Sequence, residues 1–223
     1  MSTKLIEQLL DDPDPAFACC VNDRRGVQAR PPADETLIVP LTHLANPPAT
    51  ASLLKRIPDV PGAEEAKRFY SKYDGALLYT TRDWNDEGIE IFPIEQWKDR
   101  TAEMVESWVE EADLYRDEDM PYGHNDFIAF AHSAGASNYI HWVTRGPRAG
   151  AVYWWAWTMS PRKDTPPSTP DFASFLKLIY DRPVQFFNEI LFCYTRFSDG
   201  RTGKECLPNR YLPDQNHPSI GRH

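Results

Sequence analysis

Three neighbouring histidines are the side chains whose type and spacing could support metal chemistry in this sequence. His132 and His141 fall on two successive candidate strands, so their imidazoles could approach one another, and zinc would then need a third ligand such as His124 or Asp126. No zinc motif such as HExxH accompanies them. Local hydrogen bonding in a loop and on a sheet explains these imidazoles more simply, and we expect no metal site.

A serine and the cysteines are the candidate nucleophiles. The segment Gly135-Ala136-Ser137-Asn138-Tyr139 begins like a nucleophile elbow, but Tyr139 stands where that motif has its second glycine, and the segment joins two candidate strands. The chain has no glycine-rich phosphate loop and no EF-hand spacing. Its four cysteines form no CxxC pair, which argues against zinc and thioredoxin-like redox chemistry. We therefore predict no catalytic residue and no cofactor.

Acidic side chains are the clearest candidates for binding. The 223 residues carry a net charge of -9, and eight acidic residues against one arginine lie from Glu103 to Asp119. Such a surface repels nucleic acid and anionic lipid but attracts a basic protein. A solvated helix face explains the run as readily as a partner-binding patch does. The candidate partner-binding residues are Asp86, Glu87, Glu106, Glu110, Glu111, Asp113, Asp117, Glu118 and Asp119.

A long helix is expected to carry most of these acidic residues. The segment Ile94–Tyr115 follows Pro93, which ends a strand and suits the first turn of a helix. Its apolar residues fall on one stripe, and the acidic residues occupy the other faces. The members of the stripe are Val105, Trp108, Val109 and Ala112.

Short β-rich runs bounded by turn residues predict an antiparallel sheet. Ala76–Thr80 and Gly88–Phe92 can pair as a hairpin, and an earlier short strand is expected at Leu37–Leu41. Glycine-bearing turns connect three later strands, which are Asp126–Ala131, Asn138–Val143 and Ala151–Trp157. In the last of these, Tyr153 and Trp155 face one way and Trp154 the other, so the sheet is either packed on both faces or uses one face for recognition.

Three further helices are expected to pack on this sheet. A short one is predicted at Thr3–Leu10, and a clearer one at Ala63–Tyr73 is expected to end at Asp74-Gly75. The third begins at Thr169, Pro170 and Asp171, with Thr169 as the N-cap. Its core-facing residues are expected to be Phe172, Phe175, Leu176 and Ile179.

The chain is expected to form one α+β domain with decorated ends. We predict an N-terminal, partly irregular arm at 1–45, the α+β domain at 46–195 and a polar C-terminal extension at 196–223. The N-terminus has no apolar stretch of signal-peptide length, and no run approaches the roughly 20 apolar residues that span a membrane. We expect a cytoplasmic protein that does not bind a membrane.

The order of these motifs is similar to that of the SUKH superfamily, which includes fungal cell-wall-synthesis regulators and bacterial immunity proteins of polymorphic toxin systems. The resemblance covers about residues 50–180 and has Asp74-Gly75 where the family usually has Asn-Gly. The motifs that carry it are Phe69-Tyr70-Ser71-Lys72-Tyr73-Asp74-Gly75, Ile89-Glu90-Ile91-Phe92-Pro93-Ile94, Gln96-Trp97, Asp126-Phe127-Ile128-Ala129-Phe130-Ala131, Gly150-Ala151-Val152-Tyr153-Trp154-Trp155 and Asp171-Phe172-Ala173-Ser174-Phe175-Leu176.

This resemblance implies a twisted, mainly antiparallel sheet packed by helices, and protein binding rather than catalysis. The leading hypothesis is an immunity protein that binds a cognate toxin and occludes it. An adaptor or regulatory scaffold of the same fold is the alternative, and a small-ligand or metal-dependent enzyme built on the histidine- and tryptophan-rich sheet is a third. No residue-level site is implied, and the oligomeric state stays open.

Overall fold

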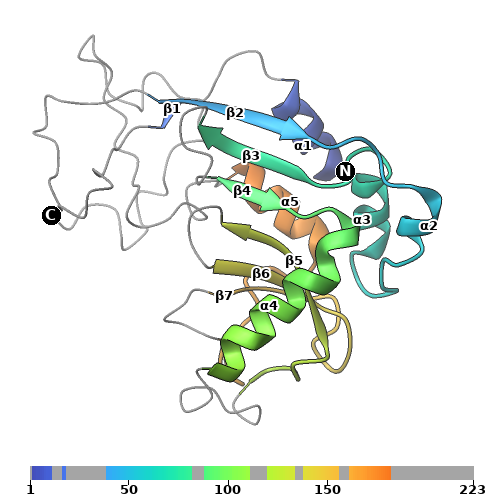
Figure 1. Ribbon diagram of the computed structural model, residues 1–223, viewed down its shortest axis with the longest axis vertical. Helices are drawn as coiled ribbons and strands as arrows, with labels where there is room; N and C mark the ends of the chain where they lie inside the picture. The colour runs from blue at the N-terminus through green and yellow to red at the C-terminus, as the bar shows by residue number, and fades with distance from the viewer. Residues whose placement is uncertain are drawn as a thin grey trace, which may run out of the picture.

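An antiparallel sheet whose strands follow one another in chain order forms the centre of the molecule (Figure 1). The computed structural model describes residues 2–11, 17–18, 39–81, 88–110, 120–133, 138–155 and 161–181. Each of the seven strands pairs with its neighbours in an antiparallel manner, which confirms the predicted sheet type. The strands are β1 (Phe17–Ala18), β2 (Val39–Ala45), β3 (Ala76–Thr81), β4 (Ile89–Ile91), β5 (Phe127–Ser133), β6 (Asn138–Val143) and β7 (Val152–Trp155).

Helices cover both faces of this sheet. Figure 1 shows α4 in front of the sheet, packed on β5, and α5 behind it. On the rear face α1, α3 and α5 pack against one another. None of the described helices is long and apolar enough to cross a membrane. The helices are α1 (Ser2–Leu10), α2 (Ala51–Leu54), α3 (Ala63–Tyr70), the 3₁₀ helix η1 (Ile94–Gln96), α4 (Trp97–Glu110) and α5 (Phe172–Asp181).

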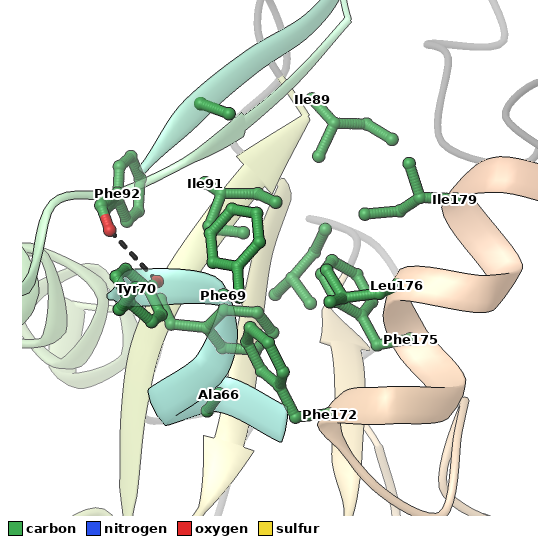
Figure 2. Packing of buried hydrophobic residues seen from close by; sticks show 14 of the residues in the cluster. Ala66, Phe69, Tyr70, Ile89, Ile91, Phe92, Phe172, Phe175, Leu176 and Ile179 are labelled. Atoms are coloured by element: carbon green, nitrogen blue, oxygen red, sulfur yellow. Dashed lines mark hydrogen bonds between the residues drawn. The ribbon is translucent and has the colours of Figure 1, made fainter. Parts of the chain in front are cut away.

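The larger core lies between the sheet and the rear helices. Its centre is aromatic: Phe172 of α5 contacts Phe69 and Tyr70 of α3 (Figure 2). Phe172 also contacts Phe130 of β5. The predicted core face of α5 is confirmed, since its four members are at most 1% exposed. Aromatic side chains bury large areas and prefer tilted or edge-to-face contacts, as seen here. This core holds α3, α5 and the sheet together.

A smaller core lies between α4 and the β5–β7 part of the sheet. Met104 of α4 is fully buried against Phe127, Ala129 and Val143. Val105, which the stripe placed toward the core, is only half-buried at the margin of this cluster. The helix face that packs on the sheet has Met104 at its centre, a residue that the periodicity analysis omitted. The side chains of Trp108 and Val109 and the whole of Ala112 lie outside the described part of the chain.

A β-bulge in β5 decides which side chains reach the α4 side of the sheet. The register between β5 and β6 shifts between Ala129 and Ala131, so one extra residue is inserted into β5. Because side chains alternate along a strand, the insertion reverses the face of every later residue. His132 therefore points to the same side as Ala129 and lies opposite Tyr139.

The predicted C-terminal end of α3 is wrong. The helix α3 ends at Tyr70, three residues before the predicted end at Tyr73. Gly75 directly precedes β3 and has a φ of 90°. A Cβ on Gly75 would lie 2.5 Å from the Ile91 carbonyl oxygen. Glycine is therefore required at this position because β4 lies too close for a side chain. It does not end the helix, although its position in the sequence resembles that of a helix-ending glycine.

The cap of α5 is Asp171 and not the predicted Thr169. The Asp171 Oδ1 accepts a hydrogen bond from the Ser174 N–H at 2.7 Å, three residues along the chain. Thr169 instead exchanges backbone hydrogen bonds with Val152 and covers the outer edge of β7.

Asp171→Ala is expected to reduce the free energy of unfolding by about 1 kcal/mol, because the Ser174 N–H loses its partner. Urea denaturation measures the difference. Asp171→Asn keeps an acceptor oxygen at this position and should cost less than half as much, and an equal loss in both variants would contradict the assignment of the cap.

Candidate protein-interaction surface

Five side chains line up across five strands on the α4 side of the sheet. The strand registers place Leu44 opposite Leu77, Leu77 opposite Glu90, Glu90 opposite His132 and His132 opposite Tyr139. Directly opposed residues of neighbouring strands point to the same face of a sheet. We name these five residues the cross-strand row.

One end of the cross-strand row is apolar and open to solvent. The Leu44 residue is 59% exposed and is the one large hydrophobic residue classed as exposed in the described part of the chain. Its neighbour Leu77 is half-buried. Single exposed leucines are common on protein surfaces, so Leu44 gains meaning only from the groups beside it.

The centre of the row is a histidine–carboxylate pair set into the sheet. His132 Nε2 lies 2.7 Å from Glu90 Oε2, and their side chains are 22% and 33% exposed. The hydrogen bond from His132 lowers the pKa of the Glu90 carboxyl, although partial burial acts in the opposite direction. Glu90 is therefore a carboxylate held in a fixed position, with part of its surface facing solvent.

The first turns of α4 add an ion pair, Arg100–Glu103, to this centre. Arg100 donates a hydrogen bond to Glu103 Oε2 at 3.0 Å, and the Tyr139 hydroxyl donates to the same oxygen at 3.1 Å. The Arg100 guanidinium also lies 5.0 Å from the ring centroid of Phe92, within cation–π range. Arg100 lowers the pKa of Glu103, again against the effect of burial.

These contacts hold the side chains of the row and of the start of α4 in fixed positions. Arginine and tyrosine are enriched at protein interfaces, and side chains already fixed by one another lose little entropy on binding. The group contains no cysteine, serine or threonine nucleophile, and no three His, Cys, Asp or Glu residues in the described segments are placed to hold a metal ion. The arrangement suits docking of a macromolecule.

The clustered histidines have separate partners. His132 pairs with Glu90, whereas His141 contacts the Tyr122 hydroxyl through Nε2 and is fully buried. His141 lies opposite Ala129, and His124 is exposed at the surface. The contacts of His132 and His141 are of the hydrogen-bonding kind that the simpler interpretation expected. The supposed elbow joins the antiparallel strands β5 and β6, and its residues 135–137 lie outside the described segments.

Only two of the predicted partner-binding residues fall in the described part of the chain. Glu106 is exposed on α4, three residues after Glu103 and so on nearly the same side of the helix. Glu110 is the last residue of α4, and its side chain is not described. Those outside the described residues are Asp86, Glu87, Glu111, Asp113, Asp117, Glu118 and Asp119.

Sequence reasoning missed most of the cross-strand row. The acidic residues it selected lie close together in sequence, whereas the row joins positions 44 to 139 through strand pairing. The available signal was the mixture of charged and apolar residues at alternating strand positions, but its use required the registers and the β5 bulge.

Comparison with known proteins identifies the family. No curated protein sequence matches the chain. The profile of the SMI1 / KNR4 family (SUKH-1) matches residues 64–178, which is more than half of the chain. The match runs from α3 to α5 and contains every member of the cross-strand row except Leu44. The chain therefore belongs to the SMI1 / KNR4 family (SUKH-1).

Proposed function

We propose that this chain is a non-enzymatic immunity protein that binds a cognate toxin domain and blocks its active site or substrate entry. Membership of SUKH-1 supports a protein-binding role. The observation that carries the proposal is the cross-strand row, in which the fixed Glu90–His132 pair lies beside the exposed Leu44. The protein acts in the cytoplasm and contacts neither nucleic acid nor membrane directly.

The proposed partner carries a basic surface. The net charge of -9 attracts a cationic protein over a distance, and a nuclease toxin has such a surface in its substrate cleft. Glu106 and Glu110 follow Glu103 along α4, so acidic residues continue from the side of the row toward the end of that helix. We propose that the acidic residues from Asp86 to Asp119 selected above contribute to this attraction.

Charge reversal on α4 is expected to slow binding. Glu106→Lys combined with Glu110→Lys should reduce the association rate about ten-fold at low salt, with a smaller effect at high salt, because surface charges act mainly on encounter. Stopped-flow or surface-plasmon measurements against the toxin encoded beside this gene provide the rates. Glu64→Lys is the control for the single variant Glu106→Lys, because both change the net charge by the same amount. Glu64 is exposed on α3 behind the sheet, so this variant should slow association less than Glu106→Lys does.

A variant of the row tests the proposed surface itself. Leu44→Asp should weaken affinity for the toxin about ten-fold or more and abolish protection of toxin-expressing cells, while stability stays near that of the wild type because Leu44 is exposed. Full binding and protection by this variant would exclude this end of the row from the interface. Tight binding of a non-toxin protein through the row, with no toxin bound, would instead identify the chain as an adaptor.

A further inference from the structure

The helix α1 docks on the rear of the molecule through a single apolar side. Ile6 and Leu9 are fully buried in the larger core, while Lys4 and Gln8 are exposed. The helix packs on α5, α3 and β2. It lies outside residues 64–178, the region that matches the family. The domain of the family and α1 are therefore distinct along the chain but share one core.

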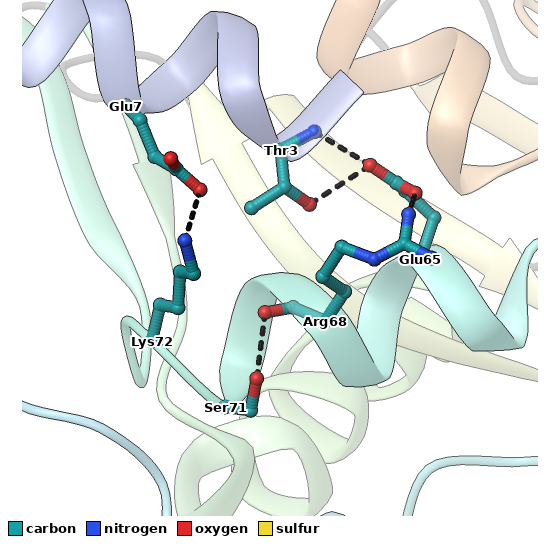
Figure 3. Close-up of polar contacts among 6 residues, drawn as sticks. All are labelled: Thr3, Glu7, Glu65, Arg68, Ser71 and Lys72. Atoms are coloured by element: carbon teal, nitrogen blue, oxygen red, sulfur yellow. Dashed lines mark hydrogen bonds and ion pairs between the residues drawn. The ribbon is translucent and has the colours of Figure 1, made fainter. Parts of the chain in front are cut away.

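A buried carboxylate holds the first turn of α1. Glu65 of α3 accepts hydrogen bonds at Oε1 from the Thr3 N–H at 2.6 Å and the Thr3 hydroxyl at 2.9 Å, while Arg68 pairs with its other oxygen (Figure 3). Burial acts to raise the pKa of Glu65, but the bonds from Thr3 help to lower it. The carboxylate is therefore charged, and it lies at the end of α1 where the helix dipole is positive.

A second contact fixes the direction of the helix. Lys72, just beyond the end of α3, pairs with Glu7 at 2.6 Å, one turn along α1 from Thr3 (Figure 3). The rest of the fold therefore contacts α1 at two polar positions, Thr3 and Glu7, and at two apolar positions, Ile6 and Leu9. This is the pattern by which grooves bind amphipathic helices.

The short length of α1 and its long connection to β2 allow α1 to detach while the rest of the fold stays intact. A nine-residue helix is marginal in isolation, so α1 owes its helical form to its packing on α3, α5 and β2. We call the surface of these three elements that α1 covers the groove. Residues 11–38 join it to β2, and even the part after β1, residues 19–38, can span about 65 Å when extended. The chain is long enough for α1 to enter the groove of a neighbouring molecule.

We propose that the groove is a helix-binding site whose second occupant is the α1 of another copy of this chain. The other copy carries the same Thr3, Ile6 and Glu7, so exchange preserves every contact described above. Exchange of an identical element is a low-cost route to a dimer. The α1 of the same chain competes with the α1 of another copy for the groove, at an effective concentration in the millimolar range. Exchanged dimers therefore form at high protein concentration or during refolding.

The test mixes two full-length variants. Ile6→Asp keeps the groove but damages the helix, and Glu65→Lys keeps the helix but repels its positive end from the groove. Each alone should remain monomeric, whereas the mixture should contain about ten-fold more heterodimer than either variant alone contains homodimer, measured by native mass spectrometry with one chain tagged. The control mixture contains Gln8→Asp in place of Ile6→Asp. It should form no heterodimer, because the same charge then lies on the exposed side of α1.

Hydrogen exchange of the wild-type chain provides an independent measurement if a variant fails to fold. Amides of α1 should exchange about ten-fold or more faster than those of β6, because α1 leaves the groove without global unfolding. Equal protection of α1 and β6 overturns the proposal. So does a mixture of folded variants that remains monomeric.

Discussion

Acidification from pH 7.5 to pH 5 is expected to remove about 2 kcal/mol of stability through His141 alone. This histidine is fully buried, with its ring 5.0 Å from that of Phe127 and stacked at 6.0 Å on that of Tyr153. Burial penalises the charged imidazolium and lowers the pKa of His141 from 6.5 to about 3. The Tyr122 hydroxyl contacts its Nε2 and is also deeply buried.

The sign follows from proton binding. Between pH 6.5 and about pH 3 the unfolded chain binds a proton at His141 that the folded chain does not, so protons favour unfolding in this window. The contribution of His141 is complete above pH 6.5 and falls as the pH approaches 3. Carboxylates with lowered pKa values, such as Glu90, add a loss in the more acidic part of the range, and pH 5 limits their share.

Two variants isolate this effect. His141→Phe keeps an aromatic ring among Tyr122, Phe127 and Tyr153 but cannot titrate, so the difference in its urea-derived free energy between pH 7.5 and pH 5 should be about 2 kcal/mol smaller than in the wild type. Tyr122→Phe removes the hydroxyl contact but leaves His141 in place, so its pH dependence should stay close to that of the wild type. An unchanged pH dependence in His141→Phe would show that His141 is protonated or exposed in the folded chain.

Local patterns were sufficient for most secondary structure. The spacing of Phe172, Phe175, Leu176 and Ile179 predicted the buried face of α5, and the turn-bounded apolar runs predicted the antiparallel strands. These features depend on alternation along one element, which sequence shows directly. Element ends depended on tertiary contacts: α3 stops at Tyr70, and β2 runs from Val39 to Ala45, beyond the expected Leu37–Leu41.

The interaction surface could not be predicted in the same way. A bulge of one residue in β5 brings His132 to the side of Tyr139, and α4 then places Arg100 and Glu103 over them. Neither the bulge nor the crossing of α4 leaves a periodic signal, since each is set by the packing of separate elements. The sequence therefore indicated an acidic surface that would attract a basic partner. The position of the Glu90–His132 pair depends on the strand registers and the β5 bulge, which the sequence alone does not give.

A methyl group added at Gly88 is expected to cause a large loss of folding stability. Gly88 has a φ of 100°, and a Cβ there would lie 2.1 Å from the Leu78 carbonyl oxygen and 2.8 Å from that of Tyr79. The neighbouring strand has little freedom to move away. Tyr79 is fully buried with a φ of 59°, its N–H donates to His43 Nδ1 at 3.0 Å, and its hydroxyl donates to the Ile179 carbonyl at 3.0 Å.

Gly88→Ala should therefore cost at least about 3 kcal/mol in the free energy of unfolding, combining a positive φ with backbone overlap. Gly146→Ala is the matched control, because Gly146 also has a positive φ, of 76°, but nothing lies within 4 Å of its Cβ position. This control should cost only about 1 kcal/mol, and the gain from a less flexible unfolded chain is common to both variants. Urea denaturation of the two proteins gives the difference. Equal losses would mean that β3 and β4 can separate at Gly88, in which case Glu90, two residues along β4, would not be held rigidly beside His132.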